Sequence, residues 1–208
     1  SGARSYVDFL RPDSAVPCAR THTTGQLDPG VFVPETIELE EAGPLRAVVR
    51  LEGMTDSIEP QRVIVRLEAY AGRACLRVFQ TVEFLHKDPR VAFVRRMGID
   101  VPLVGAAEST VFAGGQEGPV ELGRGSAAGL RQHSHLGYCA WRQDTGQRFT
   151  QTVESKARSR GWVDVSGPEG GLAVCLREMW QQFPNEISAN LPAGTVTLGF
   201  WPESVAPM

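Results

Sequence analysis

The sequence has 208 residues and a formal net charge of −3, from 21 basic and 24 acidic side chains. This length fits one large domain or two small ones with a substantial buried core, and we favour one domain. The basic residues form no block, which argues against a surface for nucleic acid or an anionic membrane. No apolar run approaches the ~18 residues of a membrane span.

Four cysteines are too widely spaced for a zinc ribbon or a redox motif: Cys18, Cys75, Cys139 and Cys175. We expect buried free thiols at Cys75 and Cys175, which stand in apolar strand patterns, although a disulfide is an open alternative. No signal peptide is recognisable at Ser1, but the chain reads as part of a longer protein. All basic residues except Lys87 and Lys156 are arginines, which suit carboxylate recognition, although codon bias explains the same enrichment.

Prolines and glycines interrupt residues 1–34, so we expect short strands and loops that act as an entry segment or interdomain linker with edge strands. Residues 35–208 are expected to form the β-sandwich domain. From Thr36 apolar and charged residues alternate with the period of two that is typical of strands with one covered face. Turns at Gly43-Pro44 and Gly72 then predict consecutive antiparallel strands up to Phe84.

The same alternation predicts a face shared by arginines and glutamates. Its members are Arg46, Arg50, Arg62, Arg66 and Arg77 with Glu52, Glu68 and Glu83. A solvated ladder of opposite charges is the simpler interpretation of this pattern. The alternative is a basic surface that receives a uronic-acid chain or a catalytic domain.

Further strands and turns are expected in the second half of the chain. Val91–Leu103 predicts a strand, and the glycine-rich stretch from Gly105 to Gly129 predicts a mobile hairpin arm. Turn residues at 167–171 predict a hairpin, whose second strand, Leu172–Leu176, is apolar throughout and is expected in the interior of a sheet. Apolar residues of Arg177–Phe183 follow at helical spacing before Pro184, and Thr195–Trp201 predicts a last strand.

Candidate functional residues gather between positions 131 and 138: Arg131, His133, His135 and Tyr138. On one strand, alternation would put His133 and His135 on the same face together with Arg131. Such a pair of imidazoles can be structural, contact a sugar or a neighbouring domain, or bind a metal, but no third ligand is identifiable, and we expect no metal site. Arginine, histidine and tyrosine are also the tools of lyase chemistry, yet proximity in sequence is not geometry.

Four tryptophans could stack on sugar rings: Trp141, Trp162, Trp180 and Trp201. We expect Trp162 and Trp201 to be buried, since they flank apolar strands. Trp180 has polar neighbours in Gln181 and Gln182 and is the better candidate for a carbohydrate or interdomain contact.

Two blocks resemble a known family. G-W-V-D-V, L-A-V-C-L-R, M-W-Q-Q-F-P-N and T-L-G-F-W-P between Gly161 and Pro202 are similar to the central β-sandwich domain of exo-rhamnogalacturonan lyases and the related YetA-like bacterial proteins. G-P-L-R-A-V-V-R-L-E-G at Gly43–Gly53 and the run at Val65–Phe84 extend the resemblance upstream. The resemblance implies a β-sandwich that precedes a helical α/α toroid carrying the elimination chemistry.

We therefore expect an all-β fold, a large antiparallel β-sandwich of supersandwich type with little helix. The resemblance implies a non-catalytic domain of a pectin-degrading protein, with no cofactor, whose partners are a catalytic α/α toroid and an acidic polysaccharide. The domain is expected to support the toroid and to line its substrate groove. A secreted or periplasmic location is preferred over a cytoplasmic one. The alternatives are a free-standing carbohydrate-binding module and an epimerase-like sugar enzyme that uses His133 or His135 with a carboxylate.

Overall fold

The computed structural model describes residues 2–12, 25–85, 93–124, 127–143, 150–155 and 157–202. Within these ranges the chain forms sixteen strands and one short 3-10 helix, η1 (Ala106–Glu108). Every strand pairing whose register is described is antiparallel, so the all-β prediction is confirmed. No helix in the described residues is long and apolar enough to cross a membrane.

The chain divides into two compact units. One comprises Tyr6–Arg95, and the other comprises Ser1–Ser5 with Arg96–Met208. These limits differ from the expected boundary between residues 34 and 35, which stays a prediction about domains.

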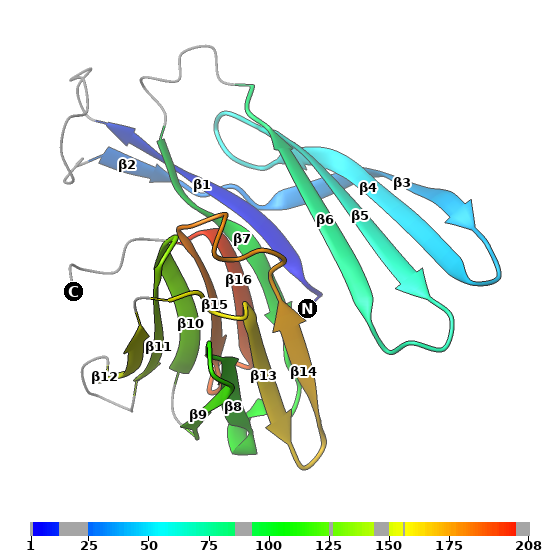
Figure 1. Ribbon diagram of the computed structural model, residues 1–208. Helices are drawn as coiled ribbons and strands as arrows, with labels where there is room; N and C mark the ends of the chain where they lie inside the picture. Colours follow the sequence, from blue (N-terminus) through cyan, green and yellow to red (C-terminus); the bar gives the residue numbers. More distant parts are fainter. Residues whose placement is uncertain are drawn as a thin grey trace. The chain divides into compact units, whose positions relative to one another are not determined.

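The unit Tyr6–Arg95 contains a four-stranded antiparallel sheet. The sheet is made of β3 (Phe32–Ala42), β4 (Arg46–Thr55), β5 (Arg62–Tyr70) and β6 (Leu76–Glu83). The unit also contains β2 (Gly25–Asp28) and most of β1 (Arg4–Pro12), which begins just outside the unit. β1 pairs with β2, and β3 to β6 follow one another as a meander, drawn in blue to green in Figure 1. Gly72, with a φ of 70°, makes the predicted turn between β5 and β6.

The register of this meander explains the alternation in its sequence. Leu51 of β4 lies between Ile37 and Val65, whereas Arg50 lies between Glu38 and Arg66. Successive side chains of a strand point to opposite faces, so one face of the sheet is apolar and the other is charged. The predicted consecutive strands are confirmed.

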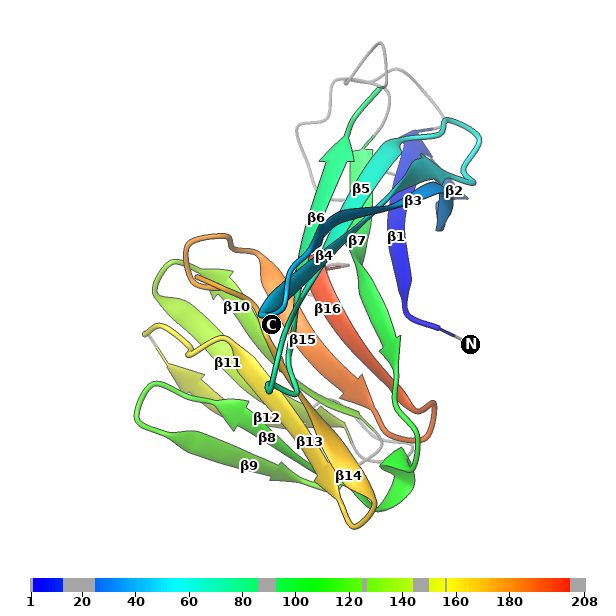
Figure 2. The same cartoon turned by 90° about the vertical axis from the view of Figure 1, so that its right-hand side faces the viewer.

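The second unit is a sandwich of two antiparallel sheets. Its strands are β7 (Phe93–Pro102), which begins just before the unit, β8 (Thr110–Gly114), β9 (Pro119–Gly123), β10 (Ala127–Ser134), β11 (Gly137–Gln143), β12 (Thr150–Ser155), β13 (Trp162–Gly167), β14 (Gly170–Cys175), β15 (Asn185–Asn190) and β16 (Thr195–Trp201). One sheet has the order β12-β11-β10-β15-β16-β7, and the other has the order β14-β13-β8-β9. Figures 1 and 2 show the two sheets as separate layers of this unit.

Small and branched apolar side chains from both sheets fill the space between the layers. Val111, Ala113, Leu122, Val163 and Val165 come from the smaller sheet, and Ala128, Leu130, Tyr138, Ala140, Ile187, Ala189 and Val196 come from the larger one. All of them are at least nine-tenths buried. Burial of this apolar surface is the main contribution that holds the sandwich together.

Three expectations for this unit need correction. The run Leu172–Leu176 supplies β14, which lies at the edge of its sheet, and the side chains of Ala173 and Cys175 are exposed. The residues Arg177–Phe183 form turns instead of a helix, and Glu178 adopts a positive φ of 53° that a helix does not contain. The hairpin expected near Gly105–Gly129 forms as β8 and β9, but it is part of the core and not a free arm.

Candidate functional site

Four of the predicted site residues belong to the β10–β11 hairpin of the sandwich. β10 ends at Ser134, His135 lies in the turn, and β11 begins at Gly137. A bulge between Gln132 and Ser134 also interrupts the pairing at His133. The strand face expected to carry both histidines therefore does not extend to His135.

Tyr138 is a core residue rather than a surface residue. Only 3% of it is exposed, and its hydroxyl oxygen accepts a hydrogen bond from the backbone N–H of Gln116 at 3.0 Å. Gln116 belongs to the turn that joins β8 to β9. Tyr138 therefore ties this turn of one sheet to β11 of the other.

Arg131 forms an ion pair with Glu186, its partner across the β10–β15 ladder. Both side chains are largely buried. Burial raises the pKa of the Glu186 carboxyl, and the attraction of the Arg131 guanidinium only partly offsets this effect. The guanidinium of Arg131 thus neutralises a buried carboxylate of the protein.

The imidazoles of His133 and His135 have different surroundings. The Nδ1 atom of His133 is buried and has no hydrogen-bond partner in the described part of the chain. A Cβ atom at Gly137 would lie 2.4 Å from Nε2 of His133, so a larger residue there would displace the imidazole from its present position. His135 is exposed, and its ring centroid lies 6.4 Å from that of Phe183. No group of three His, Cys, Asp or Glu side chains in the described ranges could hold a metal ion.

Trp180 lies in the loop of residues 176–184 that joins β14 to β15. The guanidinium carbon of Arg158 lies 3.7 Å from the centroid of the Trp180 ring, which is a cation–π contact at stacking distance. Arg158 is exposed and Trp180 is half-buried. No motif or spacing in the sequence connects Arg158 with Trp180, so this contact could not be predicted from the sequence.

A buried hydrogen-bond network holds the two segments that carry this pair. The amide oxygen of Gln132 accepts hydrogen bonds from the backbone N–H and the hydroxyl of Ser159, next to Arg158. Its amide nitrogen donates to the carbonyl oxygens of Ser134 and Gly137, at 2.7 and 3.1 Å. Since Gln132 is fully buried, the positions of β10, the hairpin turn and the Ser159 segment are coupled.

The 176–184 loop is fixed from its inner side by Met179 and Asn185. Met179 is 1% exposed, and its sulfur lies 3.6 Å from the hydroxyl oxygen of Ser159, whose single proton it shares with the amide oxygen of Gln132. The Asn185 side chain donates to the carbonyl oxygens of Met179 and Gln182, at 3.0 and 3.1 Å. These contacts hold the loop backbone on both sides of Trp180.

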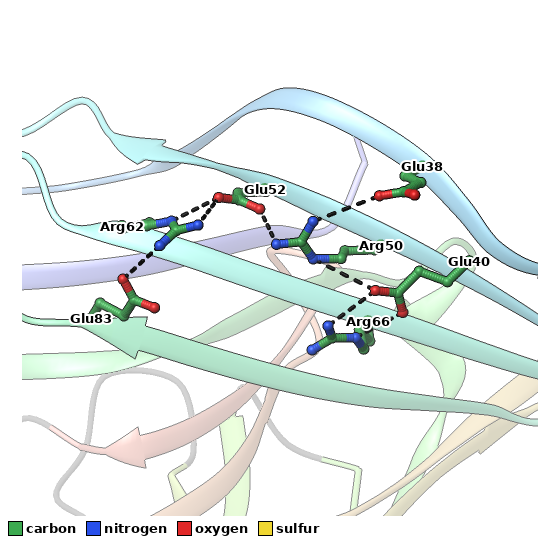
Figure 3. A network of polar contacts seen from close by, with 7 residues as sticks. All are labelled: Glu38, Glu40, Arg50, Glu52, Arg62, Arg66 and Glu83. Atoms are coloured by element: carbon green, nitrogen blue, oxygen red, sulfur yellow. Dashed lines mark hydrogen bonds and ion pairs between the residues drawn. The ribbon is translucent and has the colours of Figure 1, made fainter.

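The charged face of the β3–β6 sheet is a ladder of alternating ion pairs (Figure 3). Arg50 forms ion pairs with Glu38, Glu40 and Glu52. Arg66 donates two hydrogen bonds, of 2.8 and 3.0 Å, to the carboxylate of Glu40. Arg62 bridges Glu52 and Glu83. Elsewhere on the same sheet, Arg46 pairs with Glu68 at 2.8 Å. Each of these four arginines has an acidic partner, which supports the ladder interpretation and not a basic surface. Arg77, the fifth predicted member, instead lies over the ring of Tyr70, with its guanidinium carbon 5.3 Å from the ring centroid.

Two carboxyl groups of the ladder have pKa values that are lowered by neighbouring arginines. The hydrogen bond from Arg62 holds the pKa of Glu52 below its usual value, and the hydrogen bond from Arg66 does the same for Glu40. In both cases desolvation opposes the shift but does not cancel it. The carboxyl groups of Glu40 and Glu52 therefore stay ionised to a lower pH than an unpaired glutamate would.

The remaining tryptophans and cysteines differ in part from expectation. Trp162 is half-buried against Gly114, whereas Trp201 is exposed. Cys75 and Cys175 are free thiols but are exposed, because they stand on or beside edge strands. Cys139 is buried, and Cys18 lies outside the described residues.

Residues 128–208 match the family model described as the central beta sandwich domain of PcRGLX-like proteins. This part of the chain is thus similar to a rhamnogalacturonan-lyase-like central β-sandwich, and the predicted resemblance is confirmed there. The upstream blocks at Gly43–Gly53 and Val65–Phe84 lie outside the match, and their resemblance stays a prediction. No curated protein matches the chain.

Proposed function

We propose that the chain serves as a non-catalytic central β-sandwich in a pectin-degrading protein of several domains, where it supports a catalytic α/α toroid and lines one wall of the substrate groove. The family match over residues 128–208 carries the proposal, because it names a central sandwich domain. The matched segment contains the β10–β11 hairpin, the 176–184 loop and the strands between them.

The positions of the candidate lyase residues favour support over catalysis. Elimination beside a uronate needs a cation for the carboxylate and a base and an acid that reach the same sugar ring. Arg131 is paired with Glu186, and the hydroxyl of Tyr138 is bonded to a backbone amide. Both groups therefore stabilise the sandwich, and they are not assembled around a common point.

The alternative of an epimerase-like enzyme needs an imidazole and a carboxylate close to one sugar atom. Within the described ranges neither His133 nor His135 hydrogen-bonds to a carboxylate. The free-standing carbohydrate-binding module has more support, since Trp180 and Phe183 are presented on one loop. Both hypotheses use this surface to contact sugar. They differ because a domain that lines the substrate groove acts together with the toroid, whereas a binding module acts without it.

Lyase activity tests the proposed role. We expect the chain alone to release no unsaturated uronate from rhamnogalacturonan, followed by ultraviolet absorbance. Joining it to the α/α toroid of the parent protein should raise both the activity and the melting temperature of the toroid above those of the toroid alone. An unrelated β-sandwich joined in the same way is the matched control. Turnover by the isolated chain, or an equal gain from the control sandwich, would contradict the proposal.

A further inference from the structure

The guanidinium of Arg158 and the indole of Trp180 form a preorganised pair in the sandwich unit. The distance of 3.7 Å between the Arg158 guanidinium carbon and the ring centroid means that the cation lies directly over the aromatic face. An arginine held by its flat face keeps the N–H groups of its edge directed away from the ring. This geometry leaves the fork of donors available to a planar acceptor.

Arg158 differs from other arginines of the sandwich unit. In the described part of the chain it has no carboxylate partner, whereas Arg131 pairs with Glu186 and Arg177 approaches Glu178 at 3.7 Å. Arg160, two residues further on, donates to the carbonyl oxygen of Gln116 at 3.2 and 3.3 Å. Arg158 thus offers an ordered positive charge that no acidic group of the described residues neutralises.

The support beneath the pair is rigid and buried. Ser159 follows Arg158 directly and is held by two hydrogen bonds to the fully buried Gln132, at 3.1 and 2.9 Å. Met179 precedes Trp180 directly and is buried, and its sulfur contacts the hydroxyl of Ser159. Both partners of the stacked pair therefore stand next to residues of one network, which reduces the entropy lost when a ligand binds.

We propose that Arg158, positioned by Trp180, binds the carboxylate of a uronic-acid residue in an acidic polysaccharide. A carboxylate matches the guanidinium fork with two parallel hydrogen bonds. The indole N–H of Trp180, which has no acceptor in the described ranges, is available to a sugar hydroxyl. The identity of the polymer rests on the proposed function, and the site adds a residue that distinguishes acidic from neutral sugars.

The stacked arginine also changes the role expected for Trp180. A tryptophan that serves as a stacking platform needs an open ring face, and Arg158 covers one face of this ring. Trp180 is therefore a positioning residue for the cation. Neutral sugars, which depend on ring stacking, should bind weakly or not at all.

Calorimetric titration with galacturonic-acid oligomers and neutral galactose oligomers of equal length tests the site. We expect binding of the acidic oligomer only, weakened by salt because the contact is an exposed ion pair. R158A should weaken binding about tenfold or more, the loss expected for a charged hydrogen-bonded contact. R158K, which keeps the charge without the planar fork, should recover only part of this affinity, and W180L should weaken binding although Arg158 remains.

R177Q is the matched control, since it removes an equal charge from the loop that carries Trp180, at a side chain that is 88% exposed. The affinity of this variant should stay within about twofold of that of the unchanged protein, as expected for an exposed charge in a surface ion pair. Circular dichroism of each variant shows whether the fold is retained. The site is refuted if R158A and R177Q weaken binding equally, if neutral oligomers bind as well as acidic ones, or if the unchanged protein binds neither.

The outcomes separate this site from the proposed supporting role. If the oligomers do not bind while the chain still stabilises the toroid, the carboxylate site alone is wrong. If R158A weakens only the association with the toroid, Arg158 pairs with a carboxylate of a protein, and the sugar site is again refuted. If acidic oligomers bind but the toroid gains nothing from the chain, the supporting role fails and the site stands.

Discussion

Gln132 and Ser159 stand 27 residues apart in the sequence and are joined by two hydrogen bonds, from the backbone N–H and the hydroxyl of Ser159 to one amide oxygen. This contact ties strand β10 to the segment that precedes β13. It also connects the hairpin of the predicted histidines with the segment that carries Arg158. The region thus depends on a buried polar residue that no apolar pattern reveals.

Substitutions that shorten Ser159 or Gln132 should destabilise the sandwich more when they leave more buried hydrogen-bonding groups without a partner. S159A removes one buried hydrogen bond, and we expect a loss of about 1 kcal/mol in the free energy of unfolding. Q132A leaves a cavity and several unpaired backbone groups, and we expect a loss of about 2–4 kcal/mol. All four tryptophans lie in the sandwich unit, so urea unfolding followed by tryptophan fluorescence reports on it directly.

An exposed serine supplies the control for this pair. S166A, on an exposed position of β13, should change the free energy of unfolding by less than about 0.5 kcal/mol. If Q132A costs no more than S159A, the amide of Gln132 does not organise the region as described.

Sequence patterns predicted those parts of the fold in which local chemistry decides the structure. The β3–β6 sheet has one apolar and one charged face, so its strands show a clear period of two. The hairpin at Gly167–Gly170 was predictable for a similar reason, because glycines and a proline concentrate at its turn. Paired arginines and glutamates on the charged face follow directly from the alternation.

Other features depend on neighbours that the sequence does not identify. The apolar run Leu172–Leu176 is compatible with an interior strand, but only the sheet order shows that β14 has a partner on one side. The spacing in Arg177–Phe183 suits a helix, yet the positive φ of Glu178 makes a turn there. The contact between Arg158 and Trp180 arises from tertiary packing, so no local signal could predict it.

The buried carboxyl of Glu186 predicts an unusual pH dependence. Its pKa is raised above the ordinary value of 4.5, since burial outweighs the attraction of Arg131. The folded state then holds the proton more tightly than the unfolded state, so the contribution of Glu186 to stability is fully present below pH 4.5. This contribution is lost as the pH rises toward the raised pKa of the folded state.

The variant E186Q should remove this dependence. We expect the melting temperature of the wild-type chain, relative to that of E186Q, to fall as the pH rises from acidic to neutral. Differential scanning calorimetry at a series of pH values measures the difference between the two proteins. A difference that grows in favour of the wild type at higher pH would mean that the ion pair with Arg131 outweighs burial.

The charge ladder predicts the opposite sign for the other unit. The pKa of Glu52 is lowered by its hydrogen bond from Arg62, so its stabilising contribution is present above the unfolded pKa and is lost as the pH falls through the lowered value. We expect E52Q to reduce the acid sensitivity of the β3–β6 sheet, measured by hydrogen exchange of peptides from β4 and β5 at matched pH. E35Q, which makes the same change on an exposed position of β3 outside the ladder, should reduce it less.

Gly53 tests how closely β3 and β4 approach each other. A Cβ atom at this position would lie 2.1 Å from the carbonyl oxygen of Val33 and 2.8 Å from the backbone nitrogen of Glu35. Neither backbone atom can move without disturbing the pairing of β3 with β4. We expect G53A to destabilise the sheet by about 3 kcal/mol or more, the upper range for overpacking. G72A provides the comparison, because its Cβ would meet no atom within 4 Å and only the φ of 70° is unfavourable. That variant should cost about 1 kcal/mol. Hydrogen exchange of β3 and β4 peptides measures both effects, and equal protection in the two variants would show that β3 shifts to admit the methyl group.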